Sequence, residues 1–243
     1  MLKQTKKTID PIACKIPRSP EEKTVMQEAS LQSSESITWR IFRIMAEFVS
    51  GFQFIAQYEK TISFFGSARL DQEDRYYQDA QSLARKLGNA GFNIITGGGP
   101  GIMEAANRGA REANANSIGL NIQLPFEQRM NRFVTRGMGF HYFFTRKVML
   151  SAAGQAYVFF PGGFGTLDEF SEIITLIQTK KMERIPIVLY GRDFWEPFIS
   201  FVDETMLKKY RTIEPQDLKL FALADTVTEA FKVLAASKPR KDF

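Results

Sequence analysis

Short apolar runs alternate with amphipathic segments along most of the chain. Mostly apolar runs predict buried strands at 62–65, 92–96, 117–122, 156–160, 185–190 and 221–225. The segments between them carry apolar residues three or four positions apart, which predicts helices, including 143–153 and 194–208. Strands that alternate with helices are typical of a parallel sheet with helices on both faces. The pattern therefore predicts an α/β, Rossmann-like fold with a mostly parallel sheet of about six or seven strands.

The beginning of the chain does not follow this alternation. Residues 1–34 are polar and are interrupted by three prolines, which predicts a flexible tail, with a basic anion-binding arm as the alternative. Residues 35–60 carry apolar side chains at helical spacing and predict an amphipathic helix. Its apolar surface is wide enough for contact with its own domain and with a second subunit. We expect a tail (1–34), a helical attachment (35–60) and a Rossmann-like nucleotide-binding catalytic domain (61–243).

Composition and net charge limit the classes of binding partner that we expect for this chain. The 243 residues are 44% hydrophobic, enough for a sizeable core, and the formal net charge is +5. A positive charge suits nucleic acid, a membrane surface or a phosphorylated small molecule. We expect no nucleic acid, because no basic stripe is interleaved with aromatic residues. We expect no membrane either, because no apolar run is long enough to span one.

The chain contains one cysteine, Cys14, and one histidine, His141. A single cysteine permits no internal disulfide, and together the two residues cannot build a Cys/His zinc site, so no metal is expected. Cysteine usage of this kind, without a signal peptide, predicts a cytoplasmic location.

The central stretch of the chain, residues 156–178, reads as a strand, a glycine loop and a helix. Such a loop points backbone N–H groups at one spot, where the helix dipole favours a phosphate. The alternative is a tight turn in which Thr166 is the N-cap and Glu169 completes a capping box. Neither a dinucleotide fingerprint nor a Walker A sequence is present. In a parallel sheet this loop should converge with the loops 66–69 and 97–101.

Two adjacent cations, Arg146 and Lys147, lie near the start of the predicted helix 143–153. Cations at a helix N-terminus are disfavoured by the dipole, so an anion is expected to compensate them. The alternative is simple pairing with surface carboxylates. The preceding polar segment, 123–139, is longer than a routine connection and is predicted to form a wall of the binding site.

Several linked motifs resemble the LOG family of cytokinin riboside 5′-monophosphate phosphoribohydrolases, whose members often carry the label lysine decarboxylase. They are F-F-G-S-A-R at 64–69, T-G-G-G-P-G-I-M-E at 96–104, R-K-V-M at 146–149 and P-G-G-F-G-T-L-D-E at 161–169. The resemblance covers roughly residues 61–225. One departure concerns base recognition, because the short plant enzymes read M-H-E-R-K where this chain reads F-F-T-R-K.

The resemblance implies hydrolysis of the N-glycosidic bond of a nucleoside 5′-monophosphate, AMP or N6-modified AMP, without a cofactor. It implies Arg146 and Glu169 as catalytic residues, and the place of Glu169 in the first helical turn predicts an ionised carboxylate. It further implies a homodimer or larger homo-oligomer. The substrate-binding residues that it implies are Glu127, Lys147, Gly163, Phe164, Gly165, Thr166, Leu167, Asp168, Thr175, Gly98 and Gly99.

Two alternatives stay open. The first is a nucleotide-binding or carrier protein without hydrolase activity, because fold does not determine function. The second is a pyridoxal phosphate enzyme, in which Lys147 would form the Schiff base.

Overall fold

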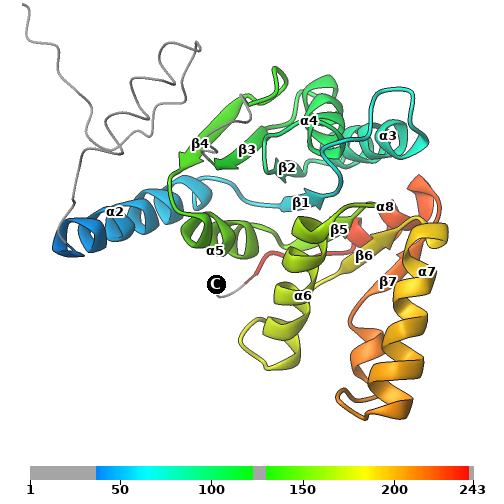
Figure 1. The fold of residues 1–243 in the computed structure, drawn as a ribbon. Helices are drawn as coiled ribbons and strands as arrows, with labels where there is room; N and C mark the ends of the chain where they lie inside the picture. Colours follow the sequence, from blue (N-terminus) through cyan, green and yellow to red (C-terminus); the bar gives the residue numbers. More distant parts are fainter. Residues whose placement is uncertain (1–36, 123–129, 241–243) are drawn as a thin grey trace, which may run out of the picture.

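The computed structural model describes residues 37–122 and 130–240. Within them, seven strands form one parallel sheet in the order β4-β3-β2-β1-β5-β6-β7 (Figure 1). This confirms the predicted Rossmann-like α/β fold. The strands are β1 (Thr61–Phe65), β2 (Asn93–Thr96), β3 (Ser117–Ile122), β4 (Arg136–Phe140), β5 (Ala156–Phe159), β6 (Ile187–Tyr190) and β7 (Ala222–Ala224).

The order of the strands places a switch point in the middle of the sheet. The chain runs outward from β1 to β4, then returns to β5, which pairs with β1 on the other side from Ile62↔Ala156 to Phe65↔Phe159. The loops that leave β1 and β5 therefore diverge to opposite faces of the sheet. In open α/β sheets, ligands bind at this position, beyond the carboxyl ends of the strands.

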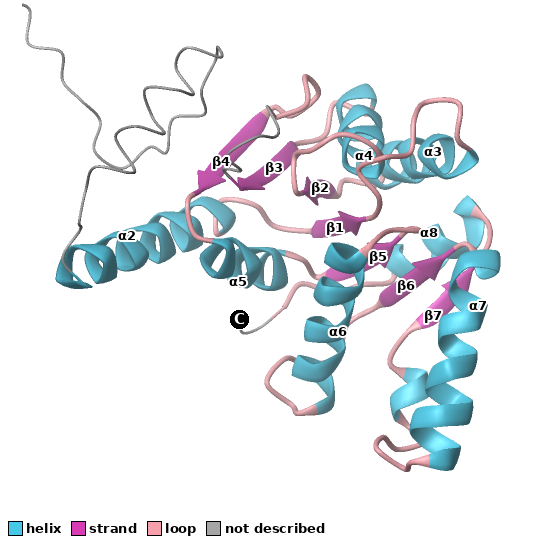
Figure 2. Ribbon diagram, viewed as in Figure 1, coloured by secondary structure: helices cyan, strands magenta, loops and turns pink. Residues whose placement is uncertain are grey.

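Helices cover both faces of the sheet (Figure 2). One face carries α3 (Arg75–Asn89), α4 (Ile102–Glu112) and α8 (Val227–Ala235). The other carries α2 (Ile37–Ile55), α5 (Phe143–Ala153), α6 (Phe164–Gln178) and α7 (Arg192–Phe201), which continues as the π-helix η1 (Val202–Lys209). A short 3₁₀ helix, η2 (Asp217–Lys219), precedes β7.

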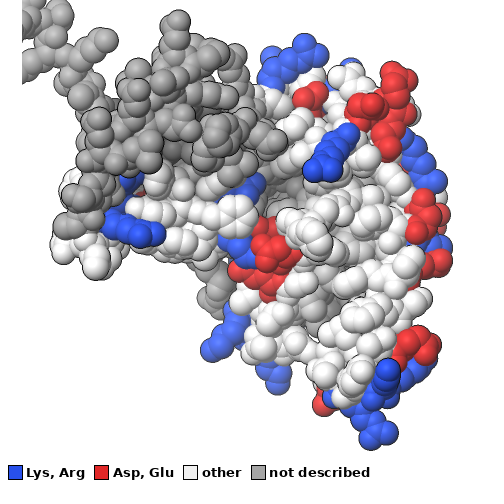
Figure 3. Space-filling model, in the orientation of Figure 1, with Lys and Arg blue, Asp and Glu red and all other residues white. Residues whose placement is uncertain are grey.

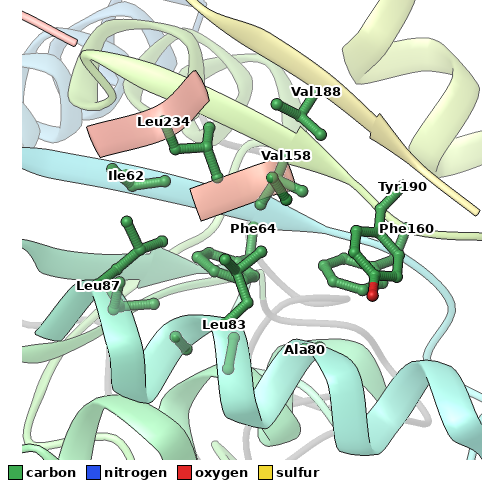
Figure 4. Close-up of a cluster of buried hydrophobic side chains, with 14 of the residues drawn as sticks. Ile62, Phe64, Ala80, Leu83, Leu87, Val158, Phe160, Val188, Tyr190 and Leu234 are labelled. Carbon is green, nitrogen blue, oxygen red and sulfur yellow. The ribbon is translucent and has the colours of Figure 1, made fainter. Parts of the chain in front are cut away.

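The central strands are buried on both sides, which is why their sequences are nearly continuous apolar runs. On one face, Ile62, Phe64 and Val158 pack with Leu83 and Leu87 of α3 (Figure 4). On the other, Phe159 packs edge-to-face with Phe170 of α6, and Trp195 of α7 donates its indole N–H to the Phe159 carbonyl. The helix that begins with the glycine loop is thus held firmly to the sheet.

The prediction that residues 123–139 form one long connection is partly wrong. Its last residues enter the edge strand β4, which pairs with β3 from Ile118↔Arg136 to Ile122↔Phe140. This strand was not predicted from its sequence, R-G-M-G-F, because a strand at the edge of a sheet is partly exposed to solvent and needs few apolar side chains. Residues 123–129 lie outside the described part of the chain.

The predicted N-terminal helix is present as α2, and it uses only part of its apolar surface in its own domain. Phe48, Phe52 and Ile55 pack against the core on the side of α5 and α6. Other apolar side chains of α2 are exposed, namely Ile37, Trp39, Ile41, Phe42, Met45 and Val49. Among the described helices, none is both long and apolar enough to cross a membrane.

Candidate active site

Three loops meet at the carboxyl edge of the sheet, as predicted. The N–H of Ser67, after β1, donates to the Pro161 carbonyl after β5 at 2.9 Å. The Ser67 carbonyl accepts from the N–H of Ile102, the first residue of α4, at 3.0 Å. Gly101 has φ +68, and a Cβ there would lie 2.2 Å from the Ser67 oxygen, so this position requires glycine. These bonds fix the loops relative to one another.

The glycine loop after β5 leads straight into α6, which begins at Phe164 with Gly163 as its N-cap. The capping-box interpretation is therefore wrong: no side chain caps this end, and the N–H of Thr166 donates to the Gly163 carbonyl at 3.0 Å. A Cβ added to Gly163 or Gly165 would meet nothing within 4 Å. The space beside the backbone is therefore open at both glycines, at a helix N-terminus where the dipole favours an anion.

Two side chains flank this open helix end. Phe164 is 92% exposed, whereas Thr166 is buried against Gly162, where an added Cβ would lie 2.1 Å from its hydroxyl oxygen. Leu167 is half-buried and Asp168 is exposed. Exposure of so large an apolar ring beside open backbone N–H groups leaves it accessible to a ligand or to a second molecule.

Glu169 lies one turn further along α6 and points into the protein. It is only 5% exposed, and within the described part of the chain its Oε2 is buried without a hydrogen-bond partner. Burial raises the pKa of Glu169 to about 7, helped by the charges of Glu172 and Asp168 and opposed by those of Lys147 and Arg146. The prediction that the first helical turn keeps Glu169 ionised is wrong, because burial leaves this carboxyl only partly ionised near pH 7.

This buried carboxyl makes stability depend on pH. The folded state holds the Glu169 proton up to about pH 7 and the unfolded state only to about 4.5, so this contribution to stability is lost as pH rises through that window. The difference corresponds to about 3 kcal/mol. Glu169→Gln, which stays neutral, should therefore be about 3 kcal/mol more stable than wild type near pH 8 and less than about 1 kcal/mol more stable near pH 5. Urea unfolding of both proteins at the two pH values measures this, and a pH-independent difference would contradict it.

Arg146, on α5, reaches over the ends of β2 and β3. Its Nε donates to the Leu120 carbonyl at 2.7 Å. Its Nη2 occupies the space beside Gly97, where an added Cβ would lie only 2.4 Å away. Burial lowers the pKa of Arg146, and the negative charge of Glu169 partly offsets this. Helix α5 thus places a partly desolvated guanidinium between the Leu120 carbonyl and the second glycine loop.

The neighbouring cation has different partners. Lys147 Nζ lies 2.5 Å from Asp168 Oδ2 and 3.3 Å from Glu172 Oε2, so it joins α5 to α6. Burial alone would lower the pKa of Lys147, but the hydrogen bond to Asp168 and the surrounding carboxylates raise it above its ordinary value. In Figure 3 an acidic group lies beside basic side chains where α5 and α6 approach each other. For Lys147 the structure therefore favours the alternative, pairing with carboxylates of the protein itself, here on α6.

The remaining candidates are less directly placed. Gly98 donates its N–H to the Thr96 hydroxyl, and the carbonyls of Gly98 and Gly99 accept from the backbone and side chain of Asn131. Thr175 is exposed and donates its hydroxyl to the Ser171 carbonyl, one turn earlier in α6. Glu127 lies outside the described residues.

Two buried asparagines close to the glycine loops were not predicted from the sequence. Asn107, fully buried on α4, receives hydrogen bonds from Thr96 and Asn131 and donates one to Ser117. Asn121, at the end of β3, is buried with its amide nitrogen unpaired among the described residues. An asparagine inside an apolar strand was the one available signal of a polar site there.

The fold and the site together define a doubly wound α/β protein with an open glycine loop at the switch point and a buried carboxylate opposed by an arginine. Residues 103–234, more than half of the chain, match the family model described as "Possible lysine decarboxylase". The chain belongs to this family, the LOG family.

Two curated relatives carry the same functional name. The cytokinin riboside 5′-monophosphate phosphoribohydrolase LOG of Oryza sativa subsp. japonica is 29% identical over 158 residues, which cover 61% of this chain and 62% of the rice protein. The cytokinin riboside 5′-monophosphate phosphoribohydrolase of Rhodococcoides fascians is 20% identical over 156 residues, covering 63% of this chain and 79% of that protein. The alignment thus spans less than two thirds of the rice relative.

Among solved structures, the molybdenum cofactor carrier protein of Chlamydomonas reinhardtii has a TM-score of 0.55 to this chain. The two are 22% identical, and the match covers 74% of this chain and 99% of the carrier. At this identity the likeness concerns the fold alone.

Proposed function

We propose that this protein hydrolyses the N-glycosidic bond of a nucleoside 5′-monophosphate, AMP or N6-modified AMP, to the free base and ribose 5-phosphate. Membership of the family and the names of the curated relatives support the reaction class. The observation that carries the proposal is the carboxyl of Glu169, buried, lacking a partner for Oε2 among the described residues and with a pKa of about 7. Burial of an unpaired carboxyl costs stability, and carboxyls with so perturbed a pKa cluster at functional sites.

The 5′-phosphate is assigned to the open end of α6. Gly163, Phe164 and Gly165 offer backbone N–H groups there, and no side chain caps them. The absence of a Cβ at both glycines allows a phosphate to approach closely. Binding energy from this remote group holds the sugar in place for reaction.

The breaking bond leaves positive charge on the sugar, so the site needs a negative group beside C1′ and a positioned water. The carboxylate of Glu169 meets both needs in its ionised form: it stabilises the oxocarbenium-like sugar and accepts a proton from the attacking water. A pKa near neutrality suits proton transfer at physiological pH. Water supplies the oxygen that bonds to C1′. The base leaves with the electrons of the broken bond and takes up a proton from solvent, and Glu169 releases to solvent the proton that it took from the attacking water.

Arg146 is assigned two roles. Its positive charge favours the ionised form of Glu169, and its guanidinium, fixed by the Leu120 carbonyl, can orient the ribose hydroxyl groups. Lys147 is assigned to a supporting role, since Asp168 and Glu172 already hold its ammonium group.

The family label raises lysine decarboxylation as the competing activity. A Schiff-base lysine needs a lowered pKa or a free amine. The pKa of Lys147 is raised, and its ammonium is paired with two carboxylates. The properties of this lysine favour the hydrolase.

A carrier without hydrolase activity is the second alternative, and the shared fold is compatible with it. A chromatographic assay of the purified protein with AMP and N6-modified AMP separates the two. The proposal predicts release of free base and ribose 5-phosphate in equal amounts. Binding of both nucleotides without release would favour the carrier.

We also propose that a second copy of the chain covers the exposed apolar face of α2. In Figure 3 the surface over α2 is largely uncharged apart from basic groups, and α2 contains a single acidic residue. Phe42→Glu should reduce the solution mass measured by light scattering, because it places a charge in an apolar contact. Tyr210→Glu, at an exposed site on the end of η1, is the control and should leave the mass unchanged. A monomeric wild-type protein would contradict the proposal.

A further inference from the structure

Glu47 of α2 reaches across to the beginning of α5. Its Oε1 accepts the backbone N–H of His141 at 2.7 Å. Its Oε2 accepts the N–H of Tyr142 at 3.3 Å and lies 2.6 Å from the hydroxyl of Thr145. One carboxylate from the N-terminal attachment thus contacts three donors at the start of the helix that carries Arg146.

At this end of α5 the Thr145 hydroxyl also lies 2.8 Å from the Tyr142 carbonyl. The N-cap of this helix, Tyr142, makes no side-chain capping bond, and the first turn contains no acidic residue. The cations at positions 146 and 147 are also disfavoured near the positive end of the helix dipole. Glu47 accepts the N–H of the N-cap Tyr142 and brings the missing negative charge, although it lies 98 positions before Thr145.

The two helices approach closely enough for this contact because Gly51 faces α5. A Cβ at Gly51 would lie 2.6 Å from Met149 Sδ, so a larger residue would push the helices apart. Thr145 is fully buried between them and is followed directly by Arg146. Where the M-H-E-R-K form of the motif has glutamate, this chain has Thr145, whose hydroxyl meets a carboxylate that comes from α2.

We propose that Glu47 is a positioning residue for Arg146. By holding the N-terminus of α5 it sets the guanidinium between the Leu120 carbonyl and Gly97. The N-terminal helix is then part of the working site as well as a surface for association. The catalytic part of this inference rests on the proposed function, but the placement of Arg146 does not.

Glu47→Gln tests this inference most directly, because it keeps the size of the side chain and removes its charge. Both oxygens of Glu47 accept hydrogen bonds, so either orientation of the glutamine amide turns an NH₂ group toward a donor. Ile55→Val is the matched control, because it weakens the packing of α2 in the core without touching the start of α5. Comparison of the two at similar losses of melting temperature separates positioning from general destabilisation.

The first readout needs no catalysis. Reaction of arginines with phenylglyoxal, followed by peptide mass spectrometry, reports the accessibility of Arg146, with the exposed Arg192 as internal reference. Glu47→Gln should raise the rate at Arg146 relative to Arg192 about fivefold or more, the scale of losing a helix cap. Ile55→Val should leave this ratio unchanged.

The second readout is kinetic. Glu47→Gln should lower kcat for AMP about 10-fold to 100-fold, because a small displacement of an oriented group is costly in catalysis. Ile55→Val should stay within about twofold of wild type at a temperature where both variants are folded. An unchanged Arg146 ratio in Glu47→Gln, or an equal change in the control, would overturn the inference. If the wild type hydrolyses no nucleotide, the proposed function fails while the phenylglyoxal ratio still decides the placement of Arg146.

Discussion

Replacing Glu169 by glutamine is expected to lower kcat for AMP by about 1,000-fold while leaving the dissociation constant within about threefold of wild type. Glutamine has nearly the same shape and fits the buried position, so the fold is retained. It carries no negative charge to stabilise the sugar cation and cannot accept a proton from water. The phosphate site proposed at the start of α6 uses backbone groups that the substitution does not change, so affinity is expected to be preserved.

The pH profile gives this prediction a second test. If the ionised form of Glu169 is active, kcat/KM of the wild type falls as pH drops below about 7, where the carboxylate becomes protonated. The residual activity of Glu169→Gln should lack this dependence. Glu172→Gln is a suitable control, since it removes a nearby charge while Lys147 keeps Asp168, and it should cost less than about 10-fold. Near-normal turnover of Glu169→Gln would show that this carboxyl is not catalytic.

Arg146→Ala is expected to lower kcat/KM by about 1,000-fold, through both a higher KM and a lower kcat. The substitution leaves the Leu120 carbonyl without its donor and empties the space beside Gly97. It also removes a cation that lowers the pKa of Glu169, so the midpoint of the kcat/KM profile should move above pH 7. This shift distinguishes the loss of a neighbouring charge from the loss of a contact to substrate alone.

Two further variants bracket this result. Arg146→Lys keeps a charge but loses the planar guanidinium that bonds the Leu120 carbonyl. Its pH midpoint of kcat/KM should therefore be closer to that of the wild type than its kcat/KM value is. Arg85→Ala removes an arginine that pairs with Glu112 on the other face of the sheet. It should leave kcat/KM and its pH midpoint unchanged. Unaltered kinetics in Arg146→Ala would place the active site elsewhere.

The order and type of most elements could be predicted from the sequence because they depend on local patterns. Buried parallel strands need apolar residues on both faces, and the runs at 62–65 and 156–160 showed this. The glycine loops were visible because tight turns and close backbone contacts need residues without a Cβ, as at Gly101. The candidate pair Arg146 and Glu169 came from linked motifs, because the spacing of these residues is visible in the sequence.

The properties of the site depended on contacts between distant parts of the chain. From its place near a helix N-terminus, Glu169 was expected to be ionised, but packing against the sheet removes water and raises its pKa to about 7. The different partners of two adjacent cations could not be predicted from the sequence either. Arg146 donates a hydrogen bond to the Leu120 carbonyl, whereas Lys147 forms an ion pair with Asp168. The edge strand β4 has too few apolar residues to be recognised before its partner β3 is known.

The sequence by itself determined the α/β fold, the glycine loop and the residue types available for chemistry, because backbone conformation and periodic burial follow from neighbouring residues. Only the tertiary structure decided which of those residues are desolvated and which are paired. It also brought Glu47 to the start of α5 from far along the chain. Charge, solvent and hydrogen bonding act through space, so they are settled only when the helices have packed on the sheet.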